Sequence, residues 1–508
     1  MSGLDLGAAR AAAEAAIAPW RAENGPGGSI LLFDRQKILA EACGGLADLA
    51  QGLAFTPDTA NRWASLTKHV FCSLLLKRGI ALDATLASLL PGLSDAVGGV
   101  AVGRALDMTS GLPDLGEFFA GLGVSSATPM RRAALTSMAK TLPALNYPQG
   151  AEISYTNTGY RLLQEVIEAD AAPLHDQWRE EFFDPLTLDI AFPHDFTEPV
   201  PHLATGYWRD AAGWHAGQYG THISASGGLA GSARSLSRWL MALLRGDAPV
   251  AGLLERISAR RTLSHGLSTF YGLGIAHAPW LGQTCFGHGG SLPGYKDHFL
   301  LAPGPGIGVV VLSNREETDS LGLALSVMAA WLGVTLPPPA PETLPEGLFA
   351  DAEGGPFWVE HKAGRLSFLG AEERLFRDSE TVAVTRSPYM SMRLAREGAR
   401  IVGDINGAER RFAPVEPGLA PDPSWAGFWR NSEFGGGLLV ELSGGAAQLT
   451  LGTAPAAVRM ALTPLGRGRA LGDGFDGPWR RRPCFVFSGD TLRVVSNRAR
   501  VLEYRRAG

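Results

Sequence analysis

The chain has 508 residues, of which 45% are apolar and 19% are charged. These proportions are typical of a globular protein and exclude an intrinsically disordered one, and the length favours about three domains. A formal net charge of −5 provides no basic field for binding nucleic acid or an anionic membrane. No zinc signature, phosphate-binding loop or dinucleotide-binding fingerprint is present, so we expect neither a metal nor another cofactor.

The cysteines and the N-terminus predict where the protein resides. The four cysteines are too far apart to form a CxxC pair, and we expect free thiols at Cys43, Cys72, Cys285 and Cys484. Residues 1–20 place apolar side chains at helical spacing but lack the basic start and unbroken apolar core of a secretory signal. No uninterrupted apolar stretch reaches about 18 residues, so no transmembrane helix is expected. We therefore predict a soluble, cytoplasmic protein.

In chain order, the first predicted elements are an N-terminal helix and a β-hairpin over residues 29–41. Mainly helical patterns joined by glycine and proline turns follow from about residue 65 to 164, and one of these helices is predicted to begin at Thr128, which precedes a proline. A second hairpin is predicted over residues 299–312, and residues 320–331 form an apolar closing helix.

The character of the sequence changes after the first predicted domain, residues 1–333. Residues 334–345 are rich in proline and are typical of a stiff, extended linker. Beyond the linker, short alternating apolar runs separated by Gly, Asp and Asn turns are typical of antiparallel β-barrels. A second proline-rich break divides these runs, which predicts one barrel over residues 346–416 and another over 417–508. The predicted fold class is therefore α+β.

A serine and a lysine at helical spacing are the candidate nucleophile and base. Positions i and i+3 lie on one helix face, so Lys68 can reach the Ser65 hydroxyl. A hydroxyl is a poor nucleophile until a base takes its proton, and lysine is a base only when burial or nearby cations keep it neutral. The apolar run over residues 70–76 predicts that this helix is buried. A serine at a helix N-terminus also offers its own N–H to a developing oxyanion.

The Ser-x-x-Lys spacing alone is a weak signal, because Ser137 and Lys140 match it too. Ser137 is expected about two turns inside the helix predicted to begin at Thr128, where no free N–H is available. We therefore assign a structural role to the second match. The chain contains six lysines in all, so a lysine rarely falls beside a given serine by chance.

Two further motifs lie downstream of Ser65. Tyr155 and Asn157 form a Tyr-x-Asn motif after a Pro-Gln-Gly turn, with a phenol that can relay a proton and an amide that can hold both the lysine and a substrate carbonyl. The alternative is a turn with an ordinary Asn cap. Later, His288 precedes Gly289 and Gly290, and two glycines on a strand allow a substrate backbone to approach closely. The alternative for His288 is an ordinary core or surface histidine.

In this order, Ser-x-x-Lys, Tyr-x-Asn and His-Gly-Gly resemble the motifs of the serine β-lactamase and penicillin-binding superfamily. The resemblance covers about residues 10–333 and includes three flanking segments, 106–114, 226–239 and 287–314. It implies an antiparallel sheet made from N- and C-terminal segments, flanked by helices and carrying an inserted helical subdomain. It also implies catalysis through an acyl-enzyme, in which Tyr155 moves a proton to the leaving group. The backbone N–H groups of Ser65 and Ser291 would form the oxyanion hole.

His288 departs from the pattern of β-lactamases and D,D-carboxypeptidases, which carry a lysine at this position. The lysine is a fixed cation for the terminal carboxylate of the substrate, and a neutral imidazole binds a carboxylate less well. Penicillinase and carboxypeptidase activities are therefore disfavoured. A catalytic domain with His-Gly-Gly followed by two small β-barrels resembles the bacterial D-aminopeptidases, which release an N-terminal D-residue from peptides, amides and esters.

In the D-aminopeptidases a loop of the third domain reaches the active site and reads the free amine of the substrate. The candidate loop in this chain spans residues 471–479. Because an ammonium group requires a nearby carboxylate, Asp473 or Asp476 is the hypothetical amine anchor. The alternative is an ordinary hairpin turn.

Two rival functions remain open from the sequence. A carboxylesterase or D-amino-acid amidase would use the same serine and lysine, whereas a penicillin- or peptidoglycan-fragment-binding protein would retain the fold without turnover. The expected partner is a small peptide or an amino-acid amide or ester, and the resemblance implies inhibition by β-lactams. No nucleic-acid or membrane partner is expected, and a homodimer is left open.

Overall fold

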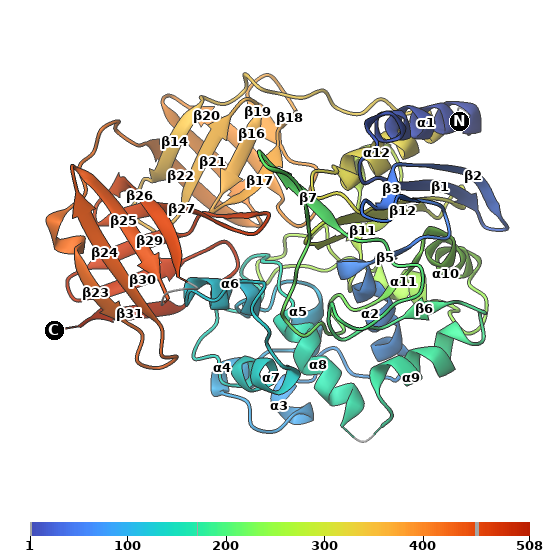
Figure 1. The fold of residues 1–508 in the computed structure, drawn as a ribbon, viewed down its shortest axis with the longest axis horizontal. Coiled ribbons are helices and arrows are strands. Elements are labelled where there is room, and N and C mark those ends of the chain that lie inside the picture. The colour runs from blue at the N-terminus through green and yellow to red at the C-terminus, as the bar shows by residue number, and fades with distance from the viewer. Residues whose placement is uncertain (1–2, 170, 453–456, 508) are drawn as a thin grey trace.

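The computed structural model describes residues 3–169, 171–452 and 457–507. Figure 1 shows a body of helices and sheet built by the first two thirds of the chain, and two strand-rich bodies built by the last third. Within the described ranges, no helix is both long enough and apolar enough to cross a bilayer.

A six-stranded antiparallel sheet forms the centre of the first body, in the order β10-β11-β12-β13-β1-β2. Its strands come from both ends of the region, because Gly28 of β1 lies opposite Ser313 of β13. This confirms the predicted sheet of N- and C-terminal segments. The strands are β1 (Gly28–Asp34), β2 (Ile38–Gly44), β10 (Ala276–His277), β11 (Phe286–Leu292), β12 (Tyr295–Ala302) and β13 (Ile307–Ser313).

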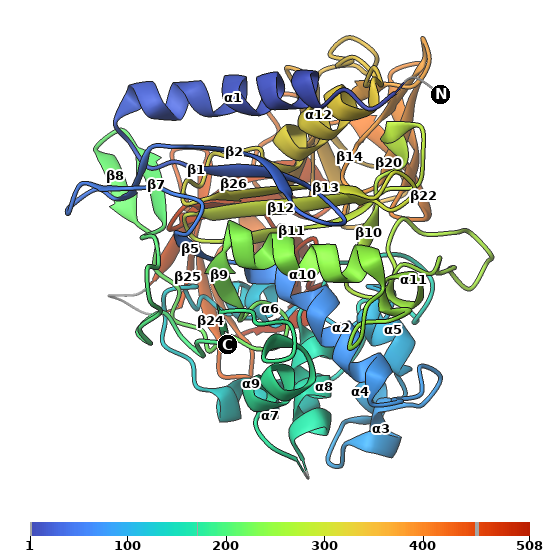
Figure 2. The ribbon, with the colours of Figure 1, turned by 90° about the vertical axis from the view of Figure 1, so that its right-hand side faces the viewer.

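Both faces of this sheet are buried, which explains why β1 is an unbroken apolar run. Successive side chains of a strand point to opposite faces. Ile30 and Leu32 therefore pack in one core with helices α1 (Leu6–Glu23) and α12 (Ser320–Leu332), while Leu31 and Phe33 pack in another core. Figure 2 shows α1 and α12 above the sheet, with α2, α10 and α11 below it.

The remaining helices lie below the sheet and form the inserted helical subdomain. They are α2 (Thr67–Lys77), α3 (Leu86–Leu89), α4 (Asp95–Gly98), α5 (Val102–Leu106), α6 (Leu115–Gly121), α7 (Arg132–Lys140), α8 (Thr158–Glu168), α9 (Leu174–Trp178), α10 (Ala233–Arg245) and α11 (Leu253–Ile257). Short strands precede α2 or lie between α9 and α10, namely β3 (Leu46–Asp48), β4 (Leu53–Ala54), β5 (Ala60–Arg62), β6 (Ile190–Ala191), β7 (Tyr207–Asp210), β8 (Gly213–Ala216) and β9 (Ala230–Ser232).

One predicted helix start is wrong. Helix α7 begins at Arg132 rather than at Thr128, whose N–H donates to Ser125 O in a turn before the helix. The second Ser-x-x-Lys pair is nevertheless on α7, where Ser137 is exposed and the Lys140 ammonium donates to the carbonyl of Pro91. This pair therefore lies on the surface.

Two antiparallel sheets fold into the strand-rich bodies, which confirms the two predicted barrels. The first is nearly closed and consists of β14 (Gly347–Asp351), β15 (Trp358–Lys362), β16 (Arg365–Phe368), β17 (Ala371–Arg374), β18 (Phe376–Arg377), β19 (Val382–Val384), β20 (Met392–Glu397), β21 (Arg400–Ile405) and β22 (Ala408–Pro414). The second closes through a β26–β27 pairing and consists of β23 (Gly427–Arg430), β24 (Gly437–Ser443), β25 (Ala446–Leu451), β26 (Val458–Gly466), β27 (Arg469–Asp476), β28 (Trp479–Arg481), β29 (Cys484–Ser488), β30 (Thr491–Val495) and β31 (Leu502–Arg506).

Alternation of apolar and polar side chains produces these barrels. In β24, Leu438 and Val440 point into the barrel core, while Leu439 and Glu441 face solvent. A period of two places every second side chain on the same face of a sheet, as a half-buried strand requires.

Candidate active site

Ser65 lies in a short 3₁₀ turn (Ala64–Leu66) between strand β5 and helix α2. The backbone of Ala64 has φ +47°, a left-handed conformation that is unfavourable for a residue with a side chain. The Trp63 N–H donates to Leu229 O at 2.9 Å, and the Trp63 indole N–H donates to Gly231 O, which together fix this turn. The chain therefore holds Ser65 at the start of α2 in a strained bend.

Lys68 is completely buried one turn after Ser65, and three oxygen atoms surround its amine. Its Nζ lies 2.7 Å from Asn157 Oδ1, 2.6 Å from Ser226 O and 3.0 Å from Ser65 Oγ. Burial lowers the pKa of Lys68 well below its ordinary value. A neutral amine has two protons, which the two carbonyl oxygens accept, and its lone pair then faces the Ser65 hydroxyl. This is the arrangement of a general base.

The Tyr-x-Asn motif meets the same lysine. The amide Oδ1 of Asn157 accepts from Lys68, while its Nδ2 and backbone N–H donate to Asp114 Oδ2 at 3.1 and 2.9 Å. The ring of Tyr155 lies 4.9 Å from Lys68 Nζ. Burial raises the pKa of Tyr155, and the nearby Ser65 hydroxyl and Arg498 guanidinium oppose this rise. Its hydroxyl is buried and has no hydrogen-bond partner in the described part of the chain.

Strand β11 lies against the Ser65 turn at two glycines. A Cβ on Gly290 would lie 2.2 Å from the carbonyl oxygen of Trp63, so only glycine allows this approach. The Gly289 N–H donates to Tyr389 and therefore points away from β12. In a strand, the N–H groups of residues i and i+2 point toward the same edge. The Ser291 N–H therefore points, like that of Gly289, toward the open edge of β11, on the side opposite β12. This orientation suits an oxyanion hole.

His288 lies on β11 but is not free to act on a substrate. Its Nδ1 is 2.6 Å from Gly289 O, which can only accept, so Nδ1 carries the proton and Nε2 accepts from the Tyr271 hydroxyl at 2.7 Å. Burial, followed by the charge of Lys68, lowers the pKa of His288 well below its usual range. The imidazole is therefore neutral and both its nitrogens are occupied, so it positions the strand rather than touching the reacting atoms.

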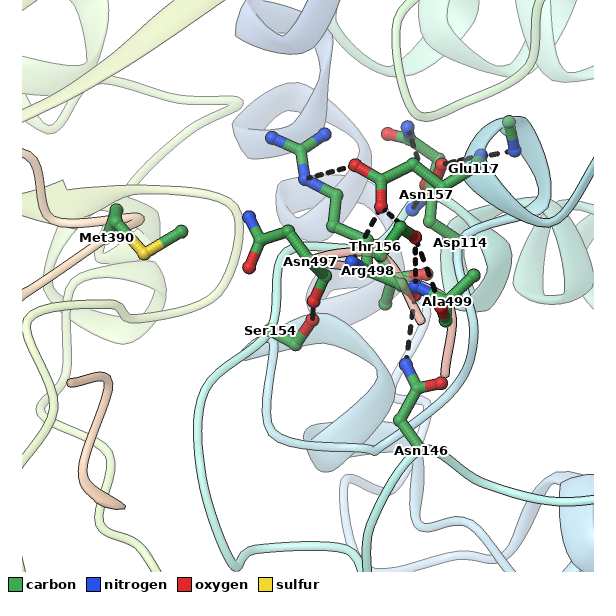
Figure 3. Close-up of polar contacts among 12 residues, drawn as sticks. Asp114, Glu117, Asn146, Ser154, Thr156, Asn157, Met390, Asn497, Arg498 and Ala499 are labelled. Atoms are coloured by element: carbon green, nitrogen blue, oxygen red, sulfur yellow. Dashed lines mark hydrogen bonds and ion pairs between the residues drawn. The ribbon is translucent and has the colours of Figure 1, made fainter. Parts of the chain in front are cut away.

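A cavity of about 1090 Å³ opens onto these residues, and both barrels contribute to its wall. From the first barrel, Tyr389 packs against Tyr155 at 5.5 Å between ring centroids and accepts from Gly289. From the second barrel, Trp479 packs near Tyr219, and Arg498 lies over the Tyr155 ring. Figure 3 shows Asn497, Arg498 and Ala499 beside Asp114 and Asn157.

The structure places Asp473 and Asp476 elsewhere than predicted. Residues 469–476 form strand β27, and the predicted loop is the hairpin to β28, whose Pro478 and Trp479 line the cavity. The Asp476 carboxylate accepts from Ser125, from the Ser126 N–H and from Arg481, while Asp473 pairs with Arg480. Neither carboxylate lines the cavity wall, and both are already compensated by arginines. These contacts argue against either one as the amine anchor.

The comparison with protein families decides the assignment of the fold. The beta-lactamase family profile matches residues 13–329, which is more than half of the chain. The chain belongs to the beta-lactamase family. The predicted superfamily and fold class are thereby confirmed, and the matched region of this beta-lactamase family member contains the Ser65, Lys68, Tyr155, Asn157 and His288 positions.

Curated relatives extend the similarity into the barrels. A D-aminopeptidase of Cereibacter sphaeroides is 26% identical over 390 residues, which span 75% of this chain and 74% of the relative. A D-aminopeptidase of Brucella ovis is 28% identical over 327 residues, or 62% of this chain and 61% of the relative.

Solved structures show the same fold. The octameric penicillin-binding protein homologue from Pyrococcus abyssi superposes with a TM-score of 0.58 and 18% identity, covering 99% of this chain and all of that one. A D-stereospecific amidohydrolase from Streptomyces sp. has a TM-score of 0.52 and 21% identity over 65% of this chain and 100% of that chain. The agreement over nearly the full length in the first case includes both barrels.

Several residues of the site escaped the sequence analysis. Asp114 is the last residue of the flanking segment 106–114, but nothing in the sequence indicated that its side chain holds Asn157. Tyr389 and Arg498 stand in ordinary turns between barrel strands, more than 230 residues beyond the Tyr-x-Asn motif in the chain. Only the packing of the barrels brings them to Tyr155, and no local pattern encodes such packing.

Proposed function

We propose that this protein is a D-aminopeptidase, a serine hydrolase that releases N-terminal D-amino acids through an acyl-enzyme on Ser65. The observation that carries the chemistry is the position of Lys68 Nζ, which lies 3.0 Å from Ser65 Oγ and 2.7 and 2.6 Å from the Asn157 and Ser226 carbonyl oxygens. In the neutral amine these two oxygens accept both protons, which leaves the lone pair for Ser65. The D-aminopeptidase names of the relatives support the substrate class.

In the acylation step, Lys68 takes the proton of Ser65 Oγ as the oxygen attacks the scissile carbonyl carbon. The carbonyl oxygen becomes an oxyanion, which the backbone N–H groups of Ser65 and Ser291 stabilise. The bond to the leaving nitrogen then breaks, and the proton on Lys68 passes to that nitrogen, with the Tyr155 hydroxyl in reach as a relay. Ser65 now carries the amino acid as an ester.

In the deacylation step, a water molecule replaces the departed amine. Lys68 takes a proton from this water, whose oxygen attacks the ester carbonyl in the same oxyanion hole. Collapse of the second tetrahedral intermediate breaks the bond to Ser65 Oγ, which recovers the proton from Lys68. The free amino acid leaves, and the starting protonation states are restored.

We assign the attraction of the substrate ammonium to Asp114 in place of Asp473 or Asp476. Asp114 lines the cavity and is separated from Lys68 only by the amide of Asn157. Its carboxylate accepts from N–H groups and forms no ion pair within the described residues. Its negative charge therefore remains available to a cation that enters beside Ser65.

The test is p-nitroaniline release from D-alanine p-nitroanilide, with the L-isomer and the N-acetylated D-compound as controls. We expect release from the free-amine D-substrate alone, and its loss in Ser65→Ala. Cleavage of the N-acetylated compound at a similar rate would refute the aminopeptidase assignment while leaving the nucleophile in place.

A second candidate is a D-amino-acid amidase or carboxylesterase with the same chemistry. Its support is the Tyr389 hydroxyl, which accepts a hydrogen bond from the Gly289 N–H at the open edge of β11. This N–H is then not available to pair with the backbone of an extended peptide. Turnover of D-alaninamide and simple esters, with longer peptides left intact, would favour this candidate.

We also propose that β-lactams acylate Ser65 and that the protein is cytoplasmic. All four cysteines are free thiols, and three of them are buried, which fits a reducing compartment.

A further inference from the structure

The segment that joins β30 to β31 is inserted beside the catalytic residues. The Asp114 N–H and the Asn146 side chain each donate to Arg498 O at 2.9 Å, and the Arg498 N–H donates to Glu117 Oε2 at 2.7 Å. The Ser496 hydroxyl donates to the same Glu117 oxygen at 2.5 Å. Figure 3 shows these contacts meeting around Arg498. The backbone of this segment is therefore fixed to the catalytic domain.

The Arg498 side chain projects from this fixed backbone into the cavity. Its guanidinium carbon lies 4.9 Å from the centroid of the Tyr155 ring, and its side chain remains 35% exposed. Its only carboxylate neighbour in the described part of the chain is Glu117, at 3.9 Å from Nε, beyond hydrogen-bonding distance. No acceptor for its two terminal nitrogens is found among the described residues. Arg498 thus presents a cation with free donors to the cavity.

Three other cations that line the cavity, Arg161, Lys296 and Arg481, are engaged by the protein. Arg161 donates to His222 O at 2.7 Å. Lys296 pairs with Glu316 at 2.8 Å and donates to Ser291 Oγ at 2.7 Å. Arg481 pairs with Asp476, and His288 is neutral for the reasons given above. Arg498 is therefore the cation best placed to receive an anionic group of a substrate bound at Ser65.

Because the Arg498 guanidinium lies over the Tyr155 ring, its position indicates which part of the substrate it would contact. In the proposed mechanism the leaving nitrogen receives its proton from the side of Lys68 and Tyr155. The residue that follows the scissile bond must then lie on the Tyr155 side of the cavity, below the guanidinium. Arginine binds a carboxylate through two parallel N–H···O bonds, a geometry that a terminal carboxylate provides.

We propose that Arg498 binds the free C-terminal carboxylate of a dipeptide whose N-terminal residue acylates Ser65. The preferred substrates are then dipeptides with an N-terminal D-residue, rather than amides or long peptides. This inference rests on the proposed function for the orientation of the scissile bond. The second barrel thereby supplies the anchoring cation that β11 lacks at His288.

The test compares D-alanylglycine with D-alanylglycinamide, which share the scissile bond and the free amine and differ only in the carboxylate. We expect wild type to prefer the acid by about tenfold or more in kcat/KM, mainly through KM. Arg498→Gln should bring the ratio close to one, and Arg498→Lys should recover part of it, because lysine keeps the charge but not the paired donors. Arg493→Gln removes an exposed arginine of β30 outside the cavity and should keep the wild-type ratio.

An equal loss for both substrates in Arg498→Gln would overturn the proposal, because Arg498 would then act only through Tyr155 or Lys68. In wild type, equal kcat/KM values for D-alanylglycine and D-alanylglycinamide would overturn it too.

If neither peptide is hydrolysed, the aminopeptidase assignment fails, and the same variants are compared on 4-carboxyphenyl acetate and 4-carbamoylphenyl acetate. A preference for the carboxylate that disappears in Arg498→Gln would then support Arg498 as the anchor, and an unchanged ratio would exclude it. All assays use a pH at which activity is maximal.

Discussion

At the scale of single residues, the proposed chemistry requires the neutral amine of Lys68. Lys68→Ala removes the amine placed to accept the Ser65 proton, so we expect kcat/KM to fall by about 10² to 10⁴-fold. The matched control is Lys140→Ala, in the second Ser-x-x-Lys pair on the surface of α7, which should leave kcat/KM within about twofold. Steady-state kinetics with D-alanine p-nitroanilide measure both. A small loss in Lys68→Ala would remove Lys68 as the base.

The protonation of Lys68 also predicts the pH dependence. Because the neutral amine is the active form, kcat/KM is lost as the pH falls through the pKa of Lys68. Burial lowers this pKa, and the Asp114 charge raises it. Asp114→Asn should therefore move the acid limb to lower pH. The pH profile of kcat/KM for p-nitrophenyl acetate, a substrate without an amine, measures this shift, and a limb that stays in place or moves to higher pH contradicts the assignment.

The residues that sequence reasoning found share one property, which is a fixed spacing along the chain. Ser65 and Lys68 are one helical turn apart, and Tyr155 and Asn157 belong to one short motif, so the local pattern identified them. His288 was found as well, but its role was not, because its Tyr271 partner comes from a different segment. Asp114 was missed as a functional side chain for the same reason.

At the scale of elements, the proposed oxyanion hole depends on the close approach of β11 to the Ser65 turn. Gly290→Ala would place a methyl group 2.2 Å from a backbone oxygen, so strand and turn must separate. A displacement of about 1 Å at a catalytic group can cost about 10²-fold in rate, and we expect a loss of this size in kcat. Gly304→Ala, in the β12–β13 turn where the nearest atom is 3.7 Å away, is the control and should retain activity. Near-normal kcat in Gly290→Ala would disprove the role of this approach.

The predicted elements were most accurate where apolar periodicity is strong. The two hairpins of the central sheet, β1–β2 and β12–β13, and the closing helix were placed within a few residues, because their alternation or helical spacing follows from burial. Helix α7 was predicted to start too early, since the Thr128-Pro129 start signal belongs to a turn. The loop predicted over residues 471–479 is mostly strand, because Gly472 and Gly474 sit in β27 and the exposed turn to β28 begins at Gly477.

At the scale of the whole molecule, one buried carboxylate joins the three bodies of the protein. Glu152 precedes the Tyr-x-Asn motif and is 8% exposed in its side chain. It pairs with Arg410 of the first barrel at 2.6 Å and with Arg500 of the second barrel. The barrels therefore dock on the segment that carries Tyr155.

Glu152→Gln leaves two buried guanidinium groups without a charge partner. Removal of one partner from a buried ion pair costs about 3–5 kcal/mol, so we expect a clear drop in the melting temperature. The control is Glu397→Gln, whose partner Arg411 is mostly exposed and which should cost less than about 1 kcal/mol. Thermal unfolding followed by circular dichroism tests both, and equal melting temperatures for the two variants would contradict this account of docking.

The sequence predicted two barrels but not how they pack on the catalytic domain. Strand alternation reports burial within a barrel, whereas Glu152, Tyr389 and Arg498 act across bodies that lie far apart along the chain. Contacts between residues that are far apart along the chain do not produce a periodic pattern of apolar residues in the sequence. The sequence accordingly offered Asp473 or Asp476 as the amine anchor without the ion pairs that each forms, and it did not indicate Arg498.

The most direct test of covalent catalysis at Ser65 is the partition of the D-alanyl group between water and added hydroxylamine. D-alanine methyl ester and D-alanine p-nitroanilide should give the same ratio of D-alanyl hydroxamate to D-alanine, because both form the same acyl-enzyme. Ser65→Ala should form neither product above background. A ratio that changes with the leaving group, or turnover that persists in Ser65→Ala, would contradict the acyl-enzyme and with it the role given to Ser65.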